Sequence, residues 1–254
     1  GSGGEAYLVG ICQLAPHDAL DAATRGFKAA LVEAFGEDGV KFDEQNAGGE
    51  YNNCATIVDG FVSENVDLML ANATYSLQAA QSATADIPIL GTAITNYGIA
   101  LGLDSTEDKV LGGNISGTSD LAPLDQQAEM LHTWFPDAQT VGLLYSLSEP
   151  NSTKPIADAK AYLDAKGIEY VEQTANTNDE VVAAASALIA DGVDAVFTPT
   201  DNVIMAAELA IYEDLAKAGI PHYTGADSFV RNGAYATCGV NYTDLGTRTA
   251  DLAL

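Results

Sequence analysis

The sequence predicts an α/β protein of two similar Rossmann-like lobes, each a parallel sheet flanked by helices, joined by crossover strands. Three observations predict it. Short apolar segments alternate with amphipathic, Ala-rich ones, as in parallel sheets covered by helices on both faces. Residues 193–221 repeat the plan of residues 66–88, from Val-Asp through a Thr-containing turn and an Ala-rich segment to Ile-Pro. Four landmarks recur in the same order at offsets of 132, 128, 127 and 133 residues: Val9 and Val141, Gly39 and Gly167, Val66 and Val193, Pro88 and Pro221.

The first lobe opens with an apolar strand at residues 7–13. A loop follows, because Pro16 has no amide donor and restricts the residue before it. Asp18 or Asp21 can cap the next helix, which ends at Gly36. The further elements of this lobe are predicted as strands at residues 40–47, 66–72, 87–92 and 114–118, with helices at residues 51–63 and from about residue 75.

The second lobe repeats this scheme. A helix at residues 120–135 ends before Pro136, and Gly167 ends a later one. Strands are predicted at residues 141–146, 168–174, 195–198 and 222–225, and helices at residues 153–166, 178–191 and 201–217. Residues 147–152 are predicted as a loop before the helix at 153–166.

Residues 234–242, AYATCGVNY, break the repeat. We expect a strand that crosses back to the first lobe, followed there by a helix at residues 245–254. The predicted lobes are therefore residues 5–118 with 236–254, and residues 119–235, with a ligand cleft between them. The sequence stops inside a predicted helix, without the closing strand that we expect, which suggests a trimmed form of a longer mature protein.

Composition limits the classes of function. At 254 residues, with 47% hydrophobic and 18% charged residues, the chain can bury a sizeable core. The 10 Lys and Arg against 36 Asp and Glu give a formal net charge of −26. This charge repels nucleic-acid phosphates and anionic lipid. We expect most carboxylates to form a solvated face, and an acidic patch that docks a basic partner is the alternative.

Signatures of catalysis and of bound metal are missing from the sequence. It contains no G-x-G-x-x-G after the first strand, no Walker lysine motif, no G-x-S-x-G and no H-E-x-x-H. Cys12, Cys54 and Cys238 form no CxxC pair, so we expect buried free thiols, with one disulfide and an odd thiol as the alternative. No apolar run reaches the ~18 residues of a membrane span. The start, Gly1-Ser2-Gly3-Gly4, resembles a cloning scar or the remnant of a tether.

The candidate site residues follow from the predicted topology. In open parallel sheets, ligands bind outside the carboxyl ends of the strands. The first lobe offers Gln13, Leu14, His17, Thr74, Tyr75, Ser76, Thr92, Thr95, Asn96 and Tyr97 there. The second lobe offers Ser146, Glu149, Asn151, Ser152, Thr200, Asp201, Asn202, Asp227 and Ser228.

These two sets differ in chemistry. The first holds hydroxyls and amides at helix N-termini, where free N–H groups suit a carboxylate. The second holds three acids, Glu149, Asp201 and Asp227, which suit an ammonium group. Together they indicate a zwitterionic ligand. For Asp201 and the Thr74–Ser76 turn, ordinary helix capping is the alternative. Tyr75 and Tyr97 either stack on a ligand ring or pack within the lobe.

A family resemblance covers nearly the whole chain in order. It is carried by Gly10-Ile11-Cys12-Gln13-Leu14, His17, Leu20-Asp21, Gln45-Asn46-Ala47-Gly48, Gly113-Asn114-Ile115-Ser116-Gly117, Tyr145, Ser148-Glu149, Asn151-Ser152, Pro199-Thr200-Asp201-Asn202, Gly233-Ala234, Gly239-Val240 and Tyr242. With these residues the chain resembles the tryptophan/tyrosine-type substrate-binding proteins of ABC transporters, which have the type I periplasmic-binding-protein fold.

The resemblance implies an exported binding protein that closes two hinged lobes on an amino acid, often aromatic, and passes it to a membrane permease. It implies no catalysis and no cofactor, a monomer, an extracellular or periplasmic location and, in the full-length form, a lipid anchor. Thr74, Thr95, Glu149, Asn151, Ser152, Asp201, Asn202 and Asp227 become contacts by this likeness. The alternatives are a sugar, nucleoside or branched amino acid as ligand, a two-lobed α/β enzyme, and the sensor lobe of a receptor or regulator.

Two loops of the first lobe depart from the family pattern. The family has Thr-Pro-Ala-Ala-Gln where this chain has Thr74-Tyr75-Ser76-Leu77-Gln78, and Thr-Asp-Pro where it has Thr95-Asn96-Tyr97. Both changes introduce a tyrosine. They bear on the side chain that is recognised more than on the class of ligand.

Overall fold

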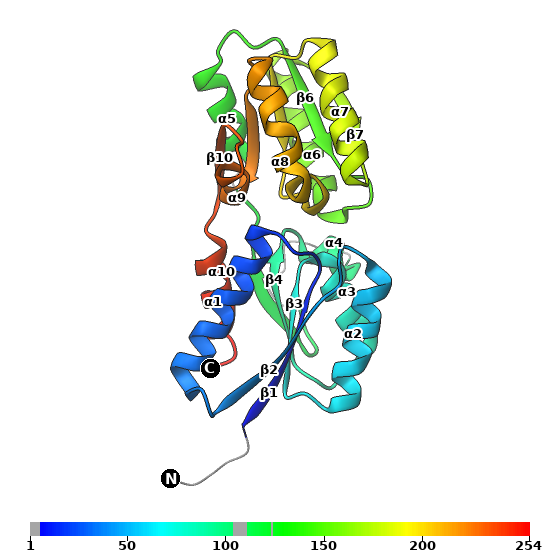
Figure 1. The fold of residues 1–254 in the computed structure, drawn as a ribbon, viewed down its shortest axis with the longest axis vertical. Helices are drawn as coiled ribbons and strands as arrows, with labels where there is room; N and C mark the ends of the chain where they lie inside the picture. Colours follow the sequence, from blue (N-terminus) through cyan, green and yellow to red (C-terminus); the bar gives the residue numbers. More distant parts are fainter. Residues whose placement is uncertain (1–5, 104–110, 123) are drawn as a thin grey trace. The chain divides into compact units, whose positions relative to one another are not determined.

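The protein forms two compact units (Figure 1). The first comprises residues 1–121 with 241–254, and the second comprises residues 122–240. The structure is a computed structural model that describes residues 6–103, 111–122 and 124–254. The Gly-Ser start at residues 1–4 lies outside the described residues. Along the part of the chain that is described, no helix has the length and apolar character needed to cross a membrane.

The first unit is a five-stranded parallel sheet with helices packed against it. Its strands are β1 (Tyr7–Gln13), β2 (Val40–Asn46), β3 (Leu68–Asn72), β4 (Ile89–Ile94) and β5 (Ile115–Ser119), in the order β2-β1-β3-β4-β5. Its helices are α1 (Asp18–Phe35), α2 (Tyr51–Glu64), α3 (Thr74–Ala83), α4 (Tyr97–Leu101) and α10 (Tyr242–Asp251). Ile11, Leu70 and Leu90 of the strands pack with Phe27 and Leu31 of α1 in its core.

The second unit repeats this plan. Its strands are β6 (Thr140–Tyr145), β7 (Glu169–Thr174), β8 (Ala195–Thr198), β9 (His222–Ala226) and β10 (Ala236–Val240). Read from the other edge, their order β7-β6-β8-β9-β10 is that of the first sheet, and all pairs are parallel. Its helices are α5 (Leu124–Trp134), α6 (Pro150–Lys166), α7 (Asn178–Asp191), α8 (Asn202–Lys217) and α9 (Asp227–Arg231). The prediction of two similar α/β lobes is confirmed.

The prediction that residues 234–242 form a strand crossing back to the first lobe is wrong. Strand β10 pairs with β9 in the second sheet, with Ala236 beside Tyr223 and Thr237 beside Thr224. The chain returns to the first unit at Asn241, and α10 begins at Tyr242. The unit boundaries therefore fall at 121/122 and 240/241. Strand β10 is the counterpart of β5, and the internal repeat did not reveal it because the sequences of these two edge strands are unlike.

Several residues expected in loops belong to the first turns of helices. Thr74 begins α3, Tyr97 begins α4 and Asp227 begins α9. Helix α6 begins at Pro150, so Asn151 lies in its first turn instead of the predicted loop at 147–152. Pro150 suits this start, because the first helical position needs no amide donor.

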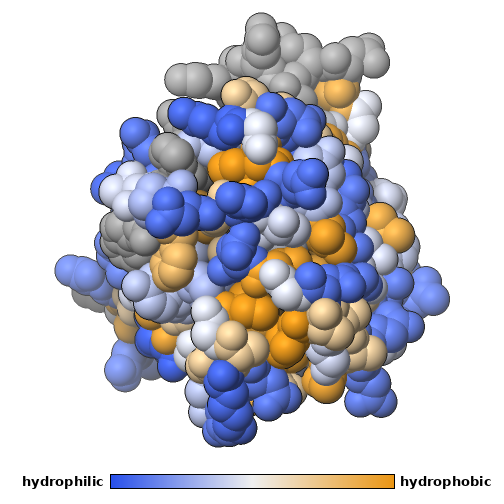
Figure 2. All heavy atoms as spheres, turned by 90° about the horizontal axis from the view of Figure 1, so that it is seen from above, coloured by the Kyte–Doolittle hydropathy of each residue, from blue (hydrophilic) through white to orange (hydrophobic). Residues whose placement is uncertain are grey.

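Hydrophilic residues predominate on the face shown in Figure 2, with smaller hydrophobic groups between them.

Helices α1 and α10 approach each other closely in the first unit (Figure 1). Gly26 of α1 faces the Thr243 carbonyl oxygen, and Gly246 of α10 faces the Ala23 carbonyl oxygen. A Cβ atom at either glycine would collide with that backbone oxygen. The two glycines therefore let the helix backbones meet, which seats the returning segment of the chain in this unit.

We expect Gly246→Ala to destabilise the protein by about 1–3 kcal/mol, because the added methyl group must push the two helices apart. Gly60→Ala in α2 is the matched control, since a Cβ there meets nothing within 4 Å. The control should gain up to about 1 kcal/mol from helix propensity. Urea unfolding of both variants tests this, and equal stability of the two would contradict the packing role of Gly246.

Candidate functional site

The carboxyl end of β1 is tied to α1 by side chains of the first unit. Gln13 is buried, its Nε2 donates to the Ala15 carbonyl (2.9 Å) and Asp21 (2.6 Å), and its Oε1 accepts from Thr24 (2.7 Å). Leu14 is 2% exposed. These contacts indicate that Gln13 holds the loop after β1 in place. Gln13 and Leu14 were both predicted as ligand contacts, and that role stays a prediction beside these contacts within the unit.

The N-terminus of α3 lacks a side-chain cap. Its N-cap residue, Ala73, has φ 85° and ψ 165°, a combination that glycine almost alone adopts without strain. The strained turn lies directly between β3 and α3. The Ala73 side chain cannot cap this end, and the dipole at a helix N-terminus favours a negative charge. The anion site predicted at Thr74–Ser76 stays a prediction.

Strain at Ala73 leads to an unusual expectation. Ala73→Gly should stabilise the protein by about 1 kcal/mol, because relief of ~1–3 kcal/mol of strain exceeds the entropy cost of glycine. The matched control is Ala80→Gly within α3, which should lose about 1 kcal/mol or more. Thermal unfolding measures both. A destabilised Ala73→Gly variant would show that the turn is not strained.

Two predicted contacts of the first unit point into its interior. Ser76 is fully buried, and its hydroxyl lies 3.5 Å from the Cys12 Sγ and 3.7 Å from the Cys54 Sγ. The Tyr97 hydroxyl lies within hydrogen-bond distance of the Gly91 (3.0 Å) and Thr118 (2.9 Å) carbonyls. Burial raises the pKa of Tyr97, and the Asp120 carboxylate adds to the rise. Of the two roles considered for Tyr97, packing is the one these contacts favour.

Asp120 is a buried acid that the sequence analysis placed only at a helix start. It follows β5 and accepts hydrogen bonds from Thr95 Oγ1 (2.8 Å) and the Tyr242 hydroxyl (2.6 Å). Burial raises its pKa, and these two donors oppose the rise. Thr95, a predicted contact, is thereby fixed beside the end of β4. Asn96 caps α4 by accepting from the Ile99 amide (3.0 Å).

Two aromatic rings lie at neighbouring helix N-termini in the first unit. Tyr75 of α3 and Tyr51 of α2 are 5.6 Å apart between ring centroids, at 75° to each other. Tyr51 is 40% exposed, so part of this pair faces outward. Tyr75 was predicted as a site residue, whereas Tyr51, which comes 24 residues earlier in the chain, was not. Only the packing of α2 against α3 brings the rings together.

Asp201 is the polar centre of the second unit. Its Oδ1 caps α8 by accepting from the Val203 and Ile204 amides, both at 3.1 Å. Its Oδ2 accepts from the Ser146 amide (2.8 Å) and the Ser152 hydroxyl (2.6 Å). Four donors fill the acceptor positions of the carboxylate. The capping role is therefore favoured over the predicted ammonium contact, and Ser152 is engaged in the same network.

Glu149 is the second acid of this group. It is 4% exposed, and its Oε2 accepts from the Asn202 Nδ2 (2.6 Å) and more distantly from the Asn202 amide (3.3 Å). Burial and the neighbouring Asp201 carboxylate raise the pKa of Glu149 to about 8, although Asn151 and Asn202 donors oppose the rise. Among the described residues it forms no ion pair. Burial and Asp201 thus favour the protonated form of the Glu149 carboxyl.

After strands β6 and β9, two buried acceptors have no donor among the residues that the structure describes. They are the Asn151 Oδ1 and the Asp227 Oδ1. The other Asp227 oxygen pairs with Arg231 at 2.6 Å. Because these atoms follow β6 and β9 in one parallel sheet, they lie at the same edge as Glu149. Such an edge suits a ligand rich in hydrogen-bond donors.

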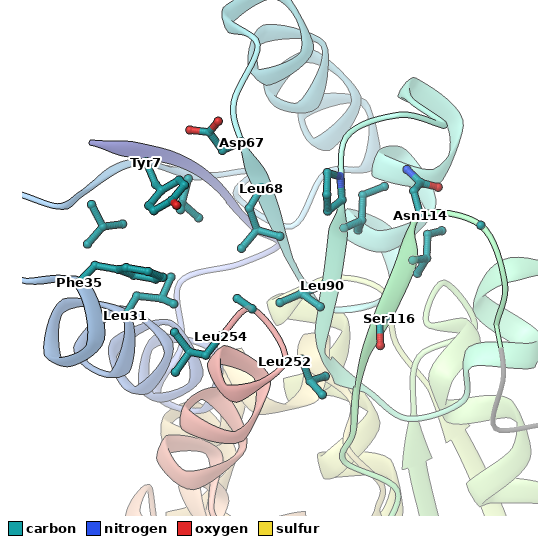
Figure 3. Close-up of a pocket in the computed structure, with 17 residues that line it drawn as sticks. Tyr7, Leu31, Phe35, Asp67, Leu68, Leu90, Asn114, Ser116, Leu252 and Leu254 are labelled. Carbon is teal, nitrogen blue, oxygen red and sulfur yellow. The ribbon is translucent and has the colours of Figure 1, made fainter. Parts of the chain in front are cut away.

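A hollow of about 780 Å³ lies at the opposite edge of the first sheet (Figure 3). Its lining comes from the amino ends of strands and from the end of the chain, including Tyr7, Leu68, Leu90, Leu252 and Leu254. The acid of its lining, Asp67, accepts from the Leu8 amide at 2.7 Å. This apolar hollow offers no pair of opposite charges. Across the described ranges, no cluster of three or more His, Cys, Asp or Glu could hold a metal ion.

Two parallel five-stranded sheets with polar strand ends define the class of the type I periplasmic binding proteins. A family model described as ABC transporter substrate binding protein matches residues 8–254. The chain belongs to this family.

Known relatives are similar over almost the full chain. A tyrosine-binding protein of Clostridioides difficile (strain R20291) is 37% identical over 248 residues, which are 97% of this chain and 71% of that protein. The structure of an ABC domain from Streptococcus pneumonia in complex with L-Trp has a TM-score of 0.91 and 30% identity, over 98% of this chain and 83% of that one. A ligand-free, open substrate binding protein with adhesive properties from Clostridium difficile has a TM-score of 0.69 and 35% identity, over 98% and 84%.

Proposed function

We propose that this protein binds a free aromatic amino acid between its two units and delivers it to an ABC importer. The observation that carries the proposal is a pair of buried acceptors without donors, Asn151 Oδ1 and Asp227 Oδ1, in the same unit as the buried acid Glu149, which has no cationic partner among the described residues. Buried acceptors in native proteins almost always have a donor. A ligand ammonium group supplies three N–H donors for these acceptors and one positive charge for the Glu149 carboxylate.

The carboxylate of the ligand is assigned to the first unit. Helix α3 starts directly after β3, at the carboxyl end of that strand, and the helix dipole favours a negative charge there. Thr74, the first residue of α3, adds a hydroxyl at the same place. An anion at this end needs no basic side chain, which fits a chain with few Lys and Arg.

The side chain of the ligand is assigned to the Tyr75–Tyr51 pair. Aromatic rings prefer edge-to-face or offset contacts, worth about 0.5–1.5 kcal/mol beyond the buried area. The family pattern has small residues and proline where this chain has Tyr75, so this ring distinguishes the chain from that pattern. The tyrosine and tryptophan ligands of the two relatives support an aromatic side chain.

The proposed mechanism follows from the assignment of the ligand's ammonium and carboxylate groups to different units. In this proposal the ligand docks on one unit, and hinge closure buries it against the other. Closure removes water from the charges, which strengthens their attraction to the protein groups. A permease partner, a monomeric state, action outside the cytoplasm, a lipid anchor in the full-length form and the absence of catalysis belong to the same proposal and rest on the family.

The first experiment is a thermal-shift screen of the twenty amino acids with a small set of sugars and nucleosides. A ligand that binds only the folded protein raises the melting temperature by mass action. We expect shifts with Tyr, Trp or Phe alone. Tyr75→Ala should then reduce the affinity for the preferred ligand about tenfold. Tyr235→Ala is the control, because Tyr235 is not assigned to the ligand, and it should leave the affinity unchanged. A shift with a sugar or nucleoside alone would overturn the proposal.

A further inference from the structure

The first unit contains two buried thiols that share one hydroxyl group. Cys12 lies in β1 and Cys54 in the first turns of α2, and the two side chains are 1% and 0% exposed. Both Sγ atoms contact the Ser76 Oγ, at 3.5 Å and 3.7 Å. The Ser76 hydroxyl therefore brings both thiols to one point of the first unit. Strand, helix and α3 thus converge on a pair of sulfur atoms.

We propose that Cys12 and Cys54 are a redox site, at which a small peroxide converts the two thiols into an intramolecular disulfide. The Cys54 thiolate attacks one peroxide oxygen, which gives a Cys54 sulfenic acid and releases hydroxide. The Cys12 sulfur then attacks the Cys54 sulfur, the S–S bond forms and water leaves. Overall, two thiols and one hydrogen peroxide give one disulfide and two waters, with two electrons passing from sulfur to oxygen.

The surroundings of the two sulfurs differ in a way that suits these roles. The neighbouring Cys12 thiol lowers the pKa of Cys54, burial opposes this, and the Ser76 hydroxyl lowers it further. The same contact, with burial, raises the pKa of Cys12, which keeps its proton. Cys54 is therefore the better nucleophile toward peroxide. Cys12 is placed to resolve the sulfenic acid before further oxidation.

The disulfide would close a loop around the 41 residues between Cys12 and Cys54. This loop contains α1 and β2. A cross-link of this kind restricts the unfolded chain, so the oxidised protein should melt several degrees higher than the reduced one. Formation of the bond requires the sulfurs to approach to ~2.05 Å, which small rotations of the two side chains must supply.

The test treats the folded protein with hydrogen peroxide in a Cys238→Ser background, which removes the one other cysteine. We expect an intact mass lower by two hydrogen atoms, a linked Cys12–Cys54 peptide, a raised melting temperature, and reversal of all three by dithiothreitol. Cys12→Ser and Cys54→Ser, each in the same background, should lose the cross-link. If either cysteine variant fails to fold, the position of the cross-link is mapped in the wild-type protein instead.

The unfolded chain provides the second control. Oxidised in guanidinium, the wild-type protein should give all three cysteine pairings, whereas the folded protein should give Cys12–Cys54 selectively. Sulfinic acid at Cys54 without a cross-link would overturn the proposal. So would a folded protein in which Cys238 is oxidised completely while Cys12 and Cys54 remain as thiols. Neither result bears on amino-acid binding, which is measured separately.

Discussion

Asp201→Ala should destabilise the second unit by about 3–5 kcal/mol, because it removes a buried carboxylate that accepts four hydrogen bonds. The substitution leaves the Ser146 amide and the Ser152 hydroxyl without their acceptor and removes the cap of α8. Urea unfolding followed by tryptophan fluorescence measures this effect. The single tryptophan, Trp134, belongs to the second unit, so the signal reports on that unit.

Two variants separate this network from ordinary capping. Asn96→Ala removes a cap with one hydrogen bond, from the Ile99 amide at 3.0 Å, and should cost about 1 kcal/mol. Asp201→Asn keeps a capping oxygen and should cost less than Asp201→Ala. If Asp201→Ala instead retains full stability and loses only ligand affinity, Asp201 contacts the ammonium and its assignment here is wrong.

Affinity for the amino acid should rise with pH between about 6 and 8, and this rise should vanish in Glu149→Gln. The pKa of Glu149 is raised to about 8 by burial and by Asp201, so the free protein holds a proton there at pH 6. An ammonium group stabilises the charged carboxylate and lowers that pKa, so binding releases the proton. Linkage then gives up to about tenfold in affinity per pH unit, until the pH reaches the pKa of the free protein.

Isothermal titration in buffers of different ionisation enthalpy counts the released protons directly. We expect up to one proton per ligand for the wild-type protein at pH 6–7 and none for Glu149→Gln. Asp227→Asn is the matched control, because this acid already pairs with Arg231. The control should keep the pH dependence. A wild-type affinity that is flat from pH 6 to 8 would rule out Glu149 as the ammonium partner.

The same pKa gives an expectation for the protein without ligand. A carboxyl whose folded pKa lies above its unfolded value of about 4.3 stabilises the protein fully below that value and loses this contribution as pH rises toward 8. Stability should therefore decline over this range, by up to roughly 4–5 kcal/mol from this group. Glu149→Gln should flatten that part of the profile in urea unfolding.

Much of the fold could be predicted from periodicity. Alternating apolar and amphipathic segments, and the offsets between the two copies, were enough to identify two α/β lobes. Strand β10 was misassigned, because nothing in AYATCGVNY states which sheet accepts it. Its pairing with β9 depends on the hydrogen-bonding edge that β9 offers in the folded second unit. The short helices α4 and α9 were also missed, since five residues carry too little periodicity.

For the candidate site, the chain by itself determined which residues reach the strand ends, because a turn after a strand places them there wherever the strand goes. The tertiary structure decided which of their polar atoms are already used. Asp201 is filled by donors 55 and 49 positions away, and Ser76 meets a thiol 64 positions away. Asp120 gains the Tyr242 hydroxyl from 122 positions away. Strand-end position is a local property, whereas saturation of a hydrogen-bonding group is set by neighbours that only folding brings near.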